Sequence, residues 1–130
     1  MPISPPPNVP SLPILNTASE AYKLWYSYLL HFPKLNRYTL GSKADSIFVD
    51  VLELILVAGS TSRQHKLLIV QRANIKLDLL KFFLKLLWEL KVLDNSKYQQ
   101  LSVPISEIGR MIGGWQKQLL KETPPNNGGE

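Results

Sequence analysis

The sequence predicts an all-α protein, an up-down-up-down antiparallel four-helix bundle with one helix too apolar for a monomer. Apolar residues recur three and four positions apart through four segments of the chain, which is the periodicity of amphipathic helices. The segments between them are short, and short connections join antiparallel neighbours. No stretch of useful length alternates apolar and polar residues as a half-buried strand does.

The first two helices each open with a pattern that is typical of a helix cap. Thr17 is followed three residues later by Glu20, and Ser42 is followed three residues later by Asp45. At this spacing the hydroxyl and the acid can satisfy free backbone N–H groups of a first turn. The first helix should therefore begin at Thr17 and end before Pro33, because the residue before a proline disfavours the helical conformation. The second helix should begin at Ser42.

The third helix should run from about residue 66 to 91, and the fourth from about residue 96 to 122. Pro104 lies inside the fourth helix and should kink or break it, because proline lacks an N–H and its ring crowds the preceding turn. The predicted loops are residues 33–41, 59–65 and 92–95.

The third helix carries two apolar seams on different sides. The first seam is Val70, Ala73, Leu77, Leu80, Leu84 and Leu87. The second is Leu68, Ile75, Leu79, Phe82, Phe83, Leu86 and Leu90. One seam can pack inside the bundle, and the other would be left as an exposed apolar patch, the mark of an interface. A long loop or tail could cover it, but the loops are short. We therefore expect a homo-oligomer, with an interface at Leu79, Phe82, Phe83 and Leu86.

The fourth helix contains three glycines, although a glycine inside a helix costs about 1 kcal/mol relative to alanine. Gly109 and Gly113 are four residues apart and so lie on one side of the helix. A missing side chain lets another backbone or a large ring approach closely. We therefore expect Gly109–Gly114 to be a packing device, with Arg110 on the opposite face.

Composition limits the class of protein. Of the 130 residues 45% are apolar and 19% charged, and there is no cysteine, so disulfides and thiol chemistry are excluded. No apolar run reaches the length of a membrane span, and the start of the chain lacks the features of a secretion signal. We expect a cytoplasmic protein with one bundle at residues 17–122, a flexible proline-rich tail at 1–16 and a flexible tail at 123–130.

The chain is basic, with a net charge of +5 and a pI near 9.5, which favours a polyanionic partner such as nucleic acid. Several cations lie one or two helical turns apart, a spacing that can follow a phosphate backbone. The alternative is that each is a solvated side chain that keeps an apolar protein soluble. The candidate binding residues are Lys81, Lys85, Arg72, Lys76, Arg110, Lys117, Lys121, Lys34, Arg37 and Lys43.

No set of residues predicts catalysis, a metal site or a bound cofactor. The two histidines, His31 and His65, are expected near opposite helix ends. The acids Asp45, Asp50 and Glu53 should point in different directions from their helix and form a solvated face. The sequence therefore favours a protein that is not an enzyme.

Three runs of residues resemble a known family. They are Phe32-Pro33-Lys34 with Arg37 to Gly41, Leu80 to Lys85, and Ile105 to Trp115, which is the most specific. Together they resemble the accessory variability proteins (Avd) of diversity-generating retroelements. The wider relatives are four-helix proteins encoded within intervening sequences of bacterial large-subunit rRNA genes. The likeness covers about residues 17 to 121.

The resemblance implies a basic, barrel-like homopentamer that binds a reverse transcriptase and template RNA and so supports mutagenic cDNA synthesis. The paired basic residues of the family fall on Lys81 and Lys85, and its Gly-Arg pair on Gly109 and Arg110. Lysine at the first pair keeps the charge but loses the two-pronged geometry of arginine. The alternatives are a structural or adaptor oligomer, or an rRNA-associated four-helix protein with no role in reverse transcription.

Overall fold

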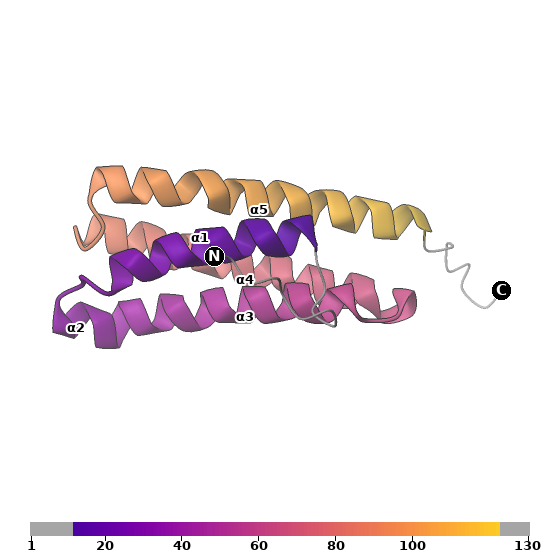
Figure 1. The fold of residues 1–130 in the computed structure, drawn as a ribbon, viewed down its shortest axis with the longest axis horizontal. Coiled ribbons are helices and arrows are strands. Elements are labelled where there is room, and N and C mark those ends of the chain that lie inside the picture. The colour runs from indigo at the N-terminus through magenta and orange to yellow at the C-terminus, as the bar shows by residue number, and fades with distance from the viewer. Residues whose placement is uncertain (1–11, 123–130) are drawn as a thin grey trace, which may run out of the picture.

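The computed structural model describes residues 12–122, which form four long helices packed antiparallel (Figure 1). The long helices are α1 (Pro13–Leu29), α3 (Ser42–Gly59), α4 (Arg63–Glu89) and α5 (Asn95–Glu122), and a short helix α2 (Lys34–Asn36) and a π-helical turn η1 (Arg37–Gly41) precede α3. The predicted all-α antiparallel arrangement is confirmed. Most of the two predicted tails, residues 1–11 and 123–130, lies outside the described residues.

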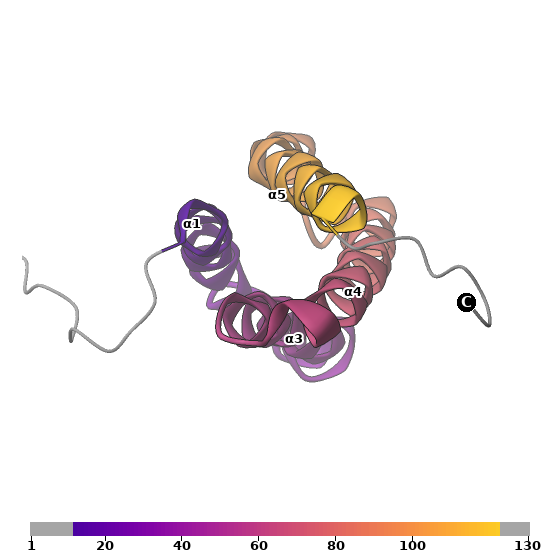
Figure 2. The ribbon, with the colours of Figure 1, turned by 90° about the vertical axis from the view of Figure 1, so that its right-hand side faces the viewer.

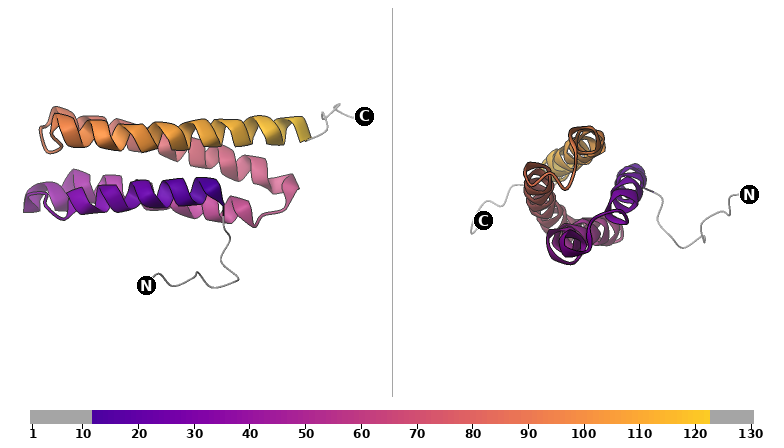
Figure 3. Two further views of the ribbon diagram at one scale, coloured as in Figure 1. Left: turned by 45° about the horizontal axis from the view of Figure 1, so that its top comes forward. Right: turned by 90° about the vertical axis from the view of Figure 1, so that its left-hand side faces the viewer.

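Views along the bundle show the long helices in the order α1, α3, α4, α5 around its axis (Figures 2 and 3). Each is in contact with two neighbours: α4 packs against α3 and α5, and α1 packs against α3 and α5. No helix within residues 12–122 is both long and apolar enough to cross a membrane.

The core is built from apolar side chains of all four long helices. Every residue of the first predicted seam on α4, from Val70 to Leu87, is buried, as are Trp25 on α1, Phe48 on α3 and Ile108 on α5. Among the described residues, no polar or charged residue is fully buried. The predicted inner side of α4 is therefore confirmed.

Helix α1 begins four residues before the predicted start. Pro13 occupies the first helical turn, where its missing N–H is not needed, and Ile14 is buried one residue later. Thr17 lies inside the helix and its hydroxyl donates to the carbonyl of Pro13 at 3.1 Å. The predicted cap at Thr17 is therefore wrong, and residues 13–16 belong to the bundle rather than to the tail.

The predicted loop 33–41 is also wrong, because the chain is helical from Lys34 through η1 and α3 to Gly59. The helix starts directly after Pro33, and η1 adds one wider turn before α3. Ser42 is thus a helix-interior residue and makes no capping hydrogen bond.

Helices α4 and α5 match their predicted ranges to within a few residues. After α4, Lys91 takes a left-handed conformation (φ 62°), the position that glycine commonly fills at a helix end. Asp94 caps α5, because its carboxylate accepts the backbone N–H of Lys97 at 2.8 Å. α5 runs without a break through Pro104, so the predicted break is not present.

One carboxylate ties α1 to α3. Asp45 accepts hydrogen bonds from the Tyr22 hydroxyl at 2.8 Å and from the Trp25 indole N–H at 3.1 Å. The expectation that Asp45 simply faces solvent is therefore wrong. Burial and then the hydrogen bond to Asp45 raise the pKa of Tyr22 to about 12.

The π-helical turn explains why Gly41 carries no side chain. A Cβ there would lie 2.8 Å from the backbone carbonyl oxygen of Asn36 and about 3 Å from Leu29 and Phe32. We expect Gly41→Ala to lower the melting temperature, with a cost on the order of 1–3 kcal/mol from overpacking. Gly114→Ala is the matched control, since a Cβ there meets nothing within 4 Å. It should gain up to about 1 kcal/mol in helix propensity. Equal melting temperatures for the two variants would contradict this account of Gly41.

The raised pKa of Tyr22 predicts a loss of stability at alkaline pH. In the unfolded chain its hydroxyl releases a proton near pH 10, whereas in the folded chain it holds the proton up to a pH of about 12. The contribution of this group is therefore fully present below pH 10 and is lost as the pH rises towards 12. Urea unfolding at pH 9 and pH 11 should show a smaller drop for Tyr22→Phe than for the unmodified protein. The control Tyr26→Phe, at an exposed tyrosine on the same helix, should behave like the unmodified protein. A parallel drop in all three proteins would count against the prediction.

Candidate functional site

The second predicted seam of α4 lies on the outside of the protomer. Ile75 and Phe82 are 61% and 57% exposed, and their neighbours along the same side are also accessible. We call this surface the outer face of α4; it consists of Leu68, Ile75, Leu79, Phe82, Leu86 and Leu90. Because these residues follow each other at helical spacing, they form one continuous apolar strip rather than scattered exposed residues.

The four predicted interface residues differ in their exposure to solvent. Leu79 and Phe82 are exposed, whereas Phe83 and Leu86 are half-buried and Phe83 also packs against the core. The rings of Phe82 and Phe83 meet edge to face, with centroids 5.2 Å apart. Phe83 therefore packs between the core and Phe82, and Phe82 is the large aromatic side chain exposed on the outer face.

Some of the predicted cations are engaged within the protomer. The Lys76 ammonium pairs with Asp50 of α3 at 3.0 Å, and Arg110 pairs with Glu107 one turn before it on α5. Lys81 lies 3.9 Å from Asp78, a longer pair than either of these and more exposed than that of Lys76 with Asp50. Pairs of this kind on a surface contribute little to stability and are screened by salt.

Arg37 is held in place by a hydrogen bond within the protomer. Its guanidinium donates to the carbonyl of Phe32 at 3.2 Å, and its Nε is buried without a hydrogen-bond partner among the described residues. It therefore holds the corner between α1 and α2 and is the least accessible of the predicted binding residues in that corner.

The remaining predicted cations are exposed and have no ion pair within residues 12–122. They are Lys34, Lys43, Arg72, Lys85, Lys117 and Lys121. The structure does not gather them into one cluster. Lys34 and Lys43 lie at the end of the bundle that holds α2, and Lys117 and Lys121 lie near the opposite end, on the last turns of α5 (Figure 1).

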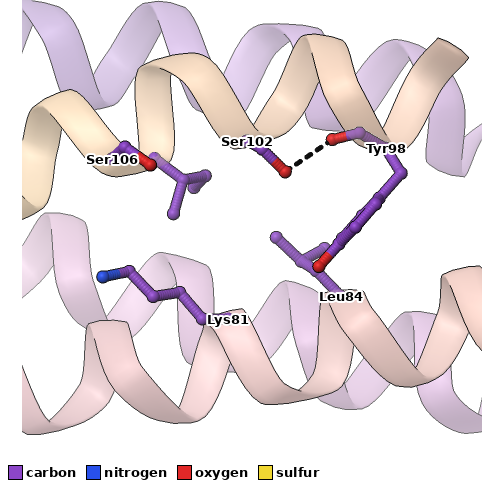
Figure 4. Close-up of a pocket in the computed structure, with 6 residues that line it drawn as sticks. Lys81, Leu84, Tyr98, Ser102 and Ser106 are labelled. Atoms are coloured by element: carbon purple, nitrogen blue, oxygen red, sulfur yellow. Dashed lines mark hydrogen bonds between the residues drawn. The ribbon is translucent and has the colours of Figure 1, made fainter. Parts of the chain in front are cut away.

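One predicted basic residue of α4 and one of α5 border adjoining hollows between these helices. A hollow of about 210 Å³ lies between these helices and is lined by Lys81, Leu84, Tyr98, Ser102, Ile105 and Ser106 (Figure 4). A second hollow, lined by Gln99, Ser102, Val103, Ser106 and Arg110, shares the two serines. Lys81 and Arg110 thus lie on either side of the serines, while Lys85 does not line the first hollow.

Sequence reasoning missed Tyr98, Ser102 and Ser106 as site residues. One signal was visible, because with Arg110 they recur every four residues and so follow one side of α5. The Ser102 hydroxyl donates to the Tyr98 carbonyl at 2.8 Å, so its proton is engaged within the helix.

The glycines of α5 behave differently from one another. A Cβ on Gly109 would lie 3.4 Å from the Lys81 Nζ and 3.6 Å from Leu77, so this position is one of close approach, to a lysine rather than to a backbone. A Cβ on Gly113 or Gly114 would meet nothing within 4 Å. The predicted packing role of Gly113 and Gly114 is therefore wrong for the protomer, where both border open space.

The described residues contain no group of three or more His, Cys, Asp and Glu side chains that could hold a metal ion. His31 and His65 are both exposed and lie beyond the C-terminus of α1 and in the first turn of α4, respectively. Asp45 and Asp50 each have a structural partner, as described above. The two aspartates thus take part in packing and ion pairing within the bundle.

Comparison with known proteins identifies the fold family. A family model described as bAvd-like matches residues 15–119, from the first turn of α1 to near the end of α5. A search of curated protein sequences found no match. The match includes each of the three runs of residues on which the resemblance rested, and it covers the outer face of α4 and both hollows. The chain therefore belongs to the bAvd-like family and is a bacterial Avd-like protein.

Proposed function

We propose that this chain is a non-enzymatic accessory protein of a diversity-generating retroelement. In this role it binds a reverse transcriptase and template RNA and so supports mutagenic cDNA synthesis. Avd-like proteins are generally non-catalytic accessory proteins, so membership of this family supports a function without catalysis. The observation that carries the proposal is the division of α4 into three sides: a buried seam, an apolar outer face and an exposed strip with Lys81 and Lys85, of which Lys81 lies beside α5.

The apolar outer face supports self-assembly. Leaving this strip in water is unfavourable, because burial stabilises by about 25 cal/mol for each Å² of apolar surface. A second copy of the chain is present at the same concentration and can cover it. We propose a homopentameric ring, the assembly that the family resemblance implies, with Leu79 and Phe82 in its interface.

The cations support binding to RNA. Each chain carries a net charge of +5, and repetition around a ring would multiply the field that attracts a polyanion. The exposed lysines and arginines contribute sites for phosphate groups without reading base sequence. The reverse transcriptase would then meet its template on the surface of the ring, in the cytoplasm.

A structural or adaptor oligomer without RNA binding is the second candidate. It is favoured by the ion pairs of Lys76 with Asp50 and of Arg110 with Glu107, which occupy two of the predicted binding cations. An rRNA-associated four-helix protein is a further alternative. The two experiments below separate self-assembly from RNA binding, and the second also tests the link to cDNA synthesis.

Self-assembly is tested by placing a charge on the outer face. The unmodified protein should scatter light as a particle several times heavier than the 14.8 kDa chain, with five chains expected. Leu79→Glu or Phe82→Glu should reduce this mass to that of the monomer, because a buried unpaired carboxylate is strongly unfavourable. Lys85→Glu introduces the same group on the same helix outside the outer face and should keep the assembly. A monomeric unmodified protein would rule out the proposed ring.

RNA binding is tested by removing cations in pairs. Lys81 with Lys85 to alanine, or Arg110 with Lys117 to alanine, should weaken binding to all RNA sequences. Each should also flatten the dependence of log Kd on log salt, by roughly 0.7 for each phosphate of a single strand that is no longer neutralised. Lys23 with Lys66 to alanine removes the same charge outside the candidate set and should have a smaller effect.

The same variants should impair cDNA synthesis when protein, reverse transcriptase and template RNA are combined. The assembled mass should not change, because these side chains lie off the outer face. Tight RNA binding by the quadruple alanine variant would place the binding surface elsewhere, with Lys34, Arg37 and Lys43 to be tested next. If the unmodified protein bound no RNA with or without the polymerase, the adaptor function would be correct instead.

A further inference from the structure

The hollow between α4 and α5 has the chemistry of an anion site. It presents the Lys81 ammonium and the hydroxyls of Ser102 and Ser106, and no acidic residue lines it. Asp78, the nearest ion-pair partner of Lys81, is 3.9 Å away with a side chain 69% exposed, so it competes weakly for the ammonium. The Ser102 proton is held by the Tyr98 carbonyl, so the hydroxyl of Ser106 is the one that can donate into the hollow. A cation beside a hydroxyl donor suits a phosphate group, which needs charge and hydrogen bonds together.

The opposite end of the same hollow is aromatic. Figure 4 shows Lys81 and Ser106 at one end and the ring of Tyr98 at the other, with Leu84 beneath. The Tyr98 ring stacks on Trp88 with centroids 5.1 Å apart and planes 12° from parallel. The Trp88 indole N–H is held by Asn95 at 2.7 Å, so the pair forms a fixed aromatic surface rather than a mobile one.

Small residues follow one another on this side of α5. Ser102, Ser106 and Gly109 succeed each other at spacings of four and three, and the two serines line the hollow. At Gly109 the absent side chain leaves the Lys81 Nζ only 3.4 Å from where a Cβ would stand. The lysine is thereby able to lie along the groove.

The geometry points to a binding site for one nucleotide in this hollow, with the phosphate between Lys81 and Ser106 and the base against Tyr98. This inference rests on the proposed function and assigns it a specific contact. A charged end and an aromatic end within one hollow match the two parts of a nucleotide in a single strand, where bases are free to stack. The adjoining hollow brings Arg110 to the far side of the two serines, where the next phosphate of the strand would lie. Base identity should matter little, because every base has a stacking face.

The first test compares two lysines one turn apart on α4. Binding of a fluorescent twelve-residue oligouridylate is measured for Lys81→Gln and for the control Lys85→Gln, an exposed lysine that does not line the hollow. Both changes remove one charge, so a purely electrostatic surface should lose equal affinity at both positions. The site predicts at least about a fivefold larger loss for Lys81→Gln, and a further loss for Ser106→Ala, by analogy with the strength of charge-assisted hydrogen bonds. Equal losses at the two lysines would overturn the inference.

The second test separates base stacking from charge. Tyr98→Leu should weaken oligouridylate binding about tenfold, a typical value when the aromatic partner of one stacked base is removed, while Tyr98→Phe should retain it. Binding of inorganic polyphosphate, which carries charge without bases, should not change for either variant. A loss for polyphosphate as large as that for oligouridylate would show that Tyr98 acts on the fold and would contradict the aromatic half of the site. Melting temperature and assembled mass are measured for each variant, and Tyr98→Phe provides the comparison if Tyr98→Leu is unstable.

The third test uses uridine monophosphate alone and does not depend on RNA binding. In the unmodified protein, amide resonances of Ser102 and Ser106 should shift on titration with millimolar nucleotide, and Lys81→Gln should abolish the shift. Saturation by the free nucleotide with no gain for the oligonucleotide would identify the ligand as a free nucleotide and would contradict a strand. If RNA binds but neither Lys81→Gln nor Tyr98→Leu differs from its control, the hollow is excluded and the proposed function stands. If neither RNA nor the nucleotide binds, both fail.

Discussion

The packing of α4 against its two neighbours is the constraint on which the rest of the structure depends. The inner seam of α4 is buried between α3 and α5 along the length of the helix. The other sides of the same helix carry a second apolar seam and a polar strip. With 27 residues, α4 is long enough for each side to extend over several turns. Rotation of α4 by one residue would bury Lys81 or Asp78 in place of leucine, so core packing determines which side chains reach the outside.

The groove between α4 and α5 shows how core packing creates chemistry at its edge. Leu84 and Ile105 form the floor of the hollow and belong to the core, whereas Lys81 and Ser106 form the rim. The rim side chains are therefore attached to backbone held by tight apolar packing. A site built this way needs little reorganisation when a ligand arrives, which reduces the entropy lost on binding.

Periodicity predicted the arrangement of helices well because burial follows spacing on each helix separately. The inner seam of α4 and the exposure of Phe82 both followed from residue positions alone. The caps at Thr17 and Ser42 were mispredicted because a hydroxyl followed by an acid three residues later also occurs inside helices. Periodicity could not predict pairs of residues on different helices. Asp45 accepts hydrogen bonds from Tyr22 and Trp25 on another helix, 23 and 20 residues earlier in the chain.

The candidate site was predictable in part. Lys81 and Arg110 were identified from the helical spacing of the cations and again from the family resemblance. The hollow between them depends on how α4 and α5 face each other, and Ser102 and Ser106 have no distinctive chemistry in the sequence. Gly113 was given a packing role on the basis of its spacing from Gly109, yet the two positions have different surroundings. The spacing of glycines shows which side of a helix lacks bulky side chains. Only the packing of the neighbouring helix determines whether other atoms occupy the space on that side.

The π-helical turn at Arg37–Gly41 has a consequence for how the chain can vary in length. A π turn holds one residue more than an α turn, yet each completes one full rotation of the helix. Loss of a single residue in this turn would therefore convert it to an α turn and leave Asp45 on the side that faces Tyr22 and Trp25, whose hydroxyl and indole N–H donate to it. We expect a one-residue change in chain length to be tolerated better at this corner than inside α3, because it alters neither the facing of α3 nor the residues of the two hollows.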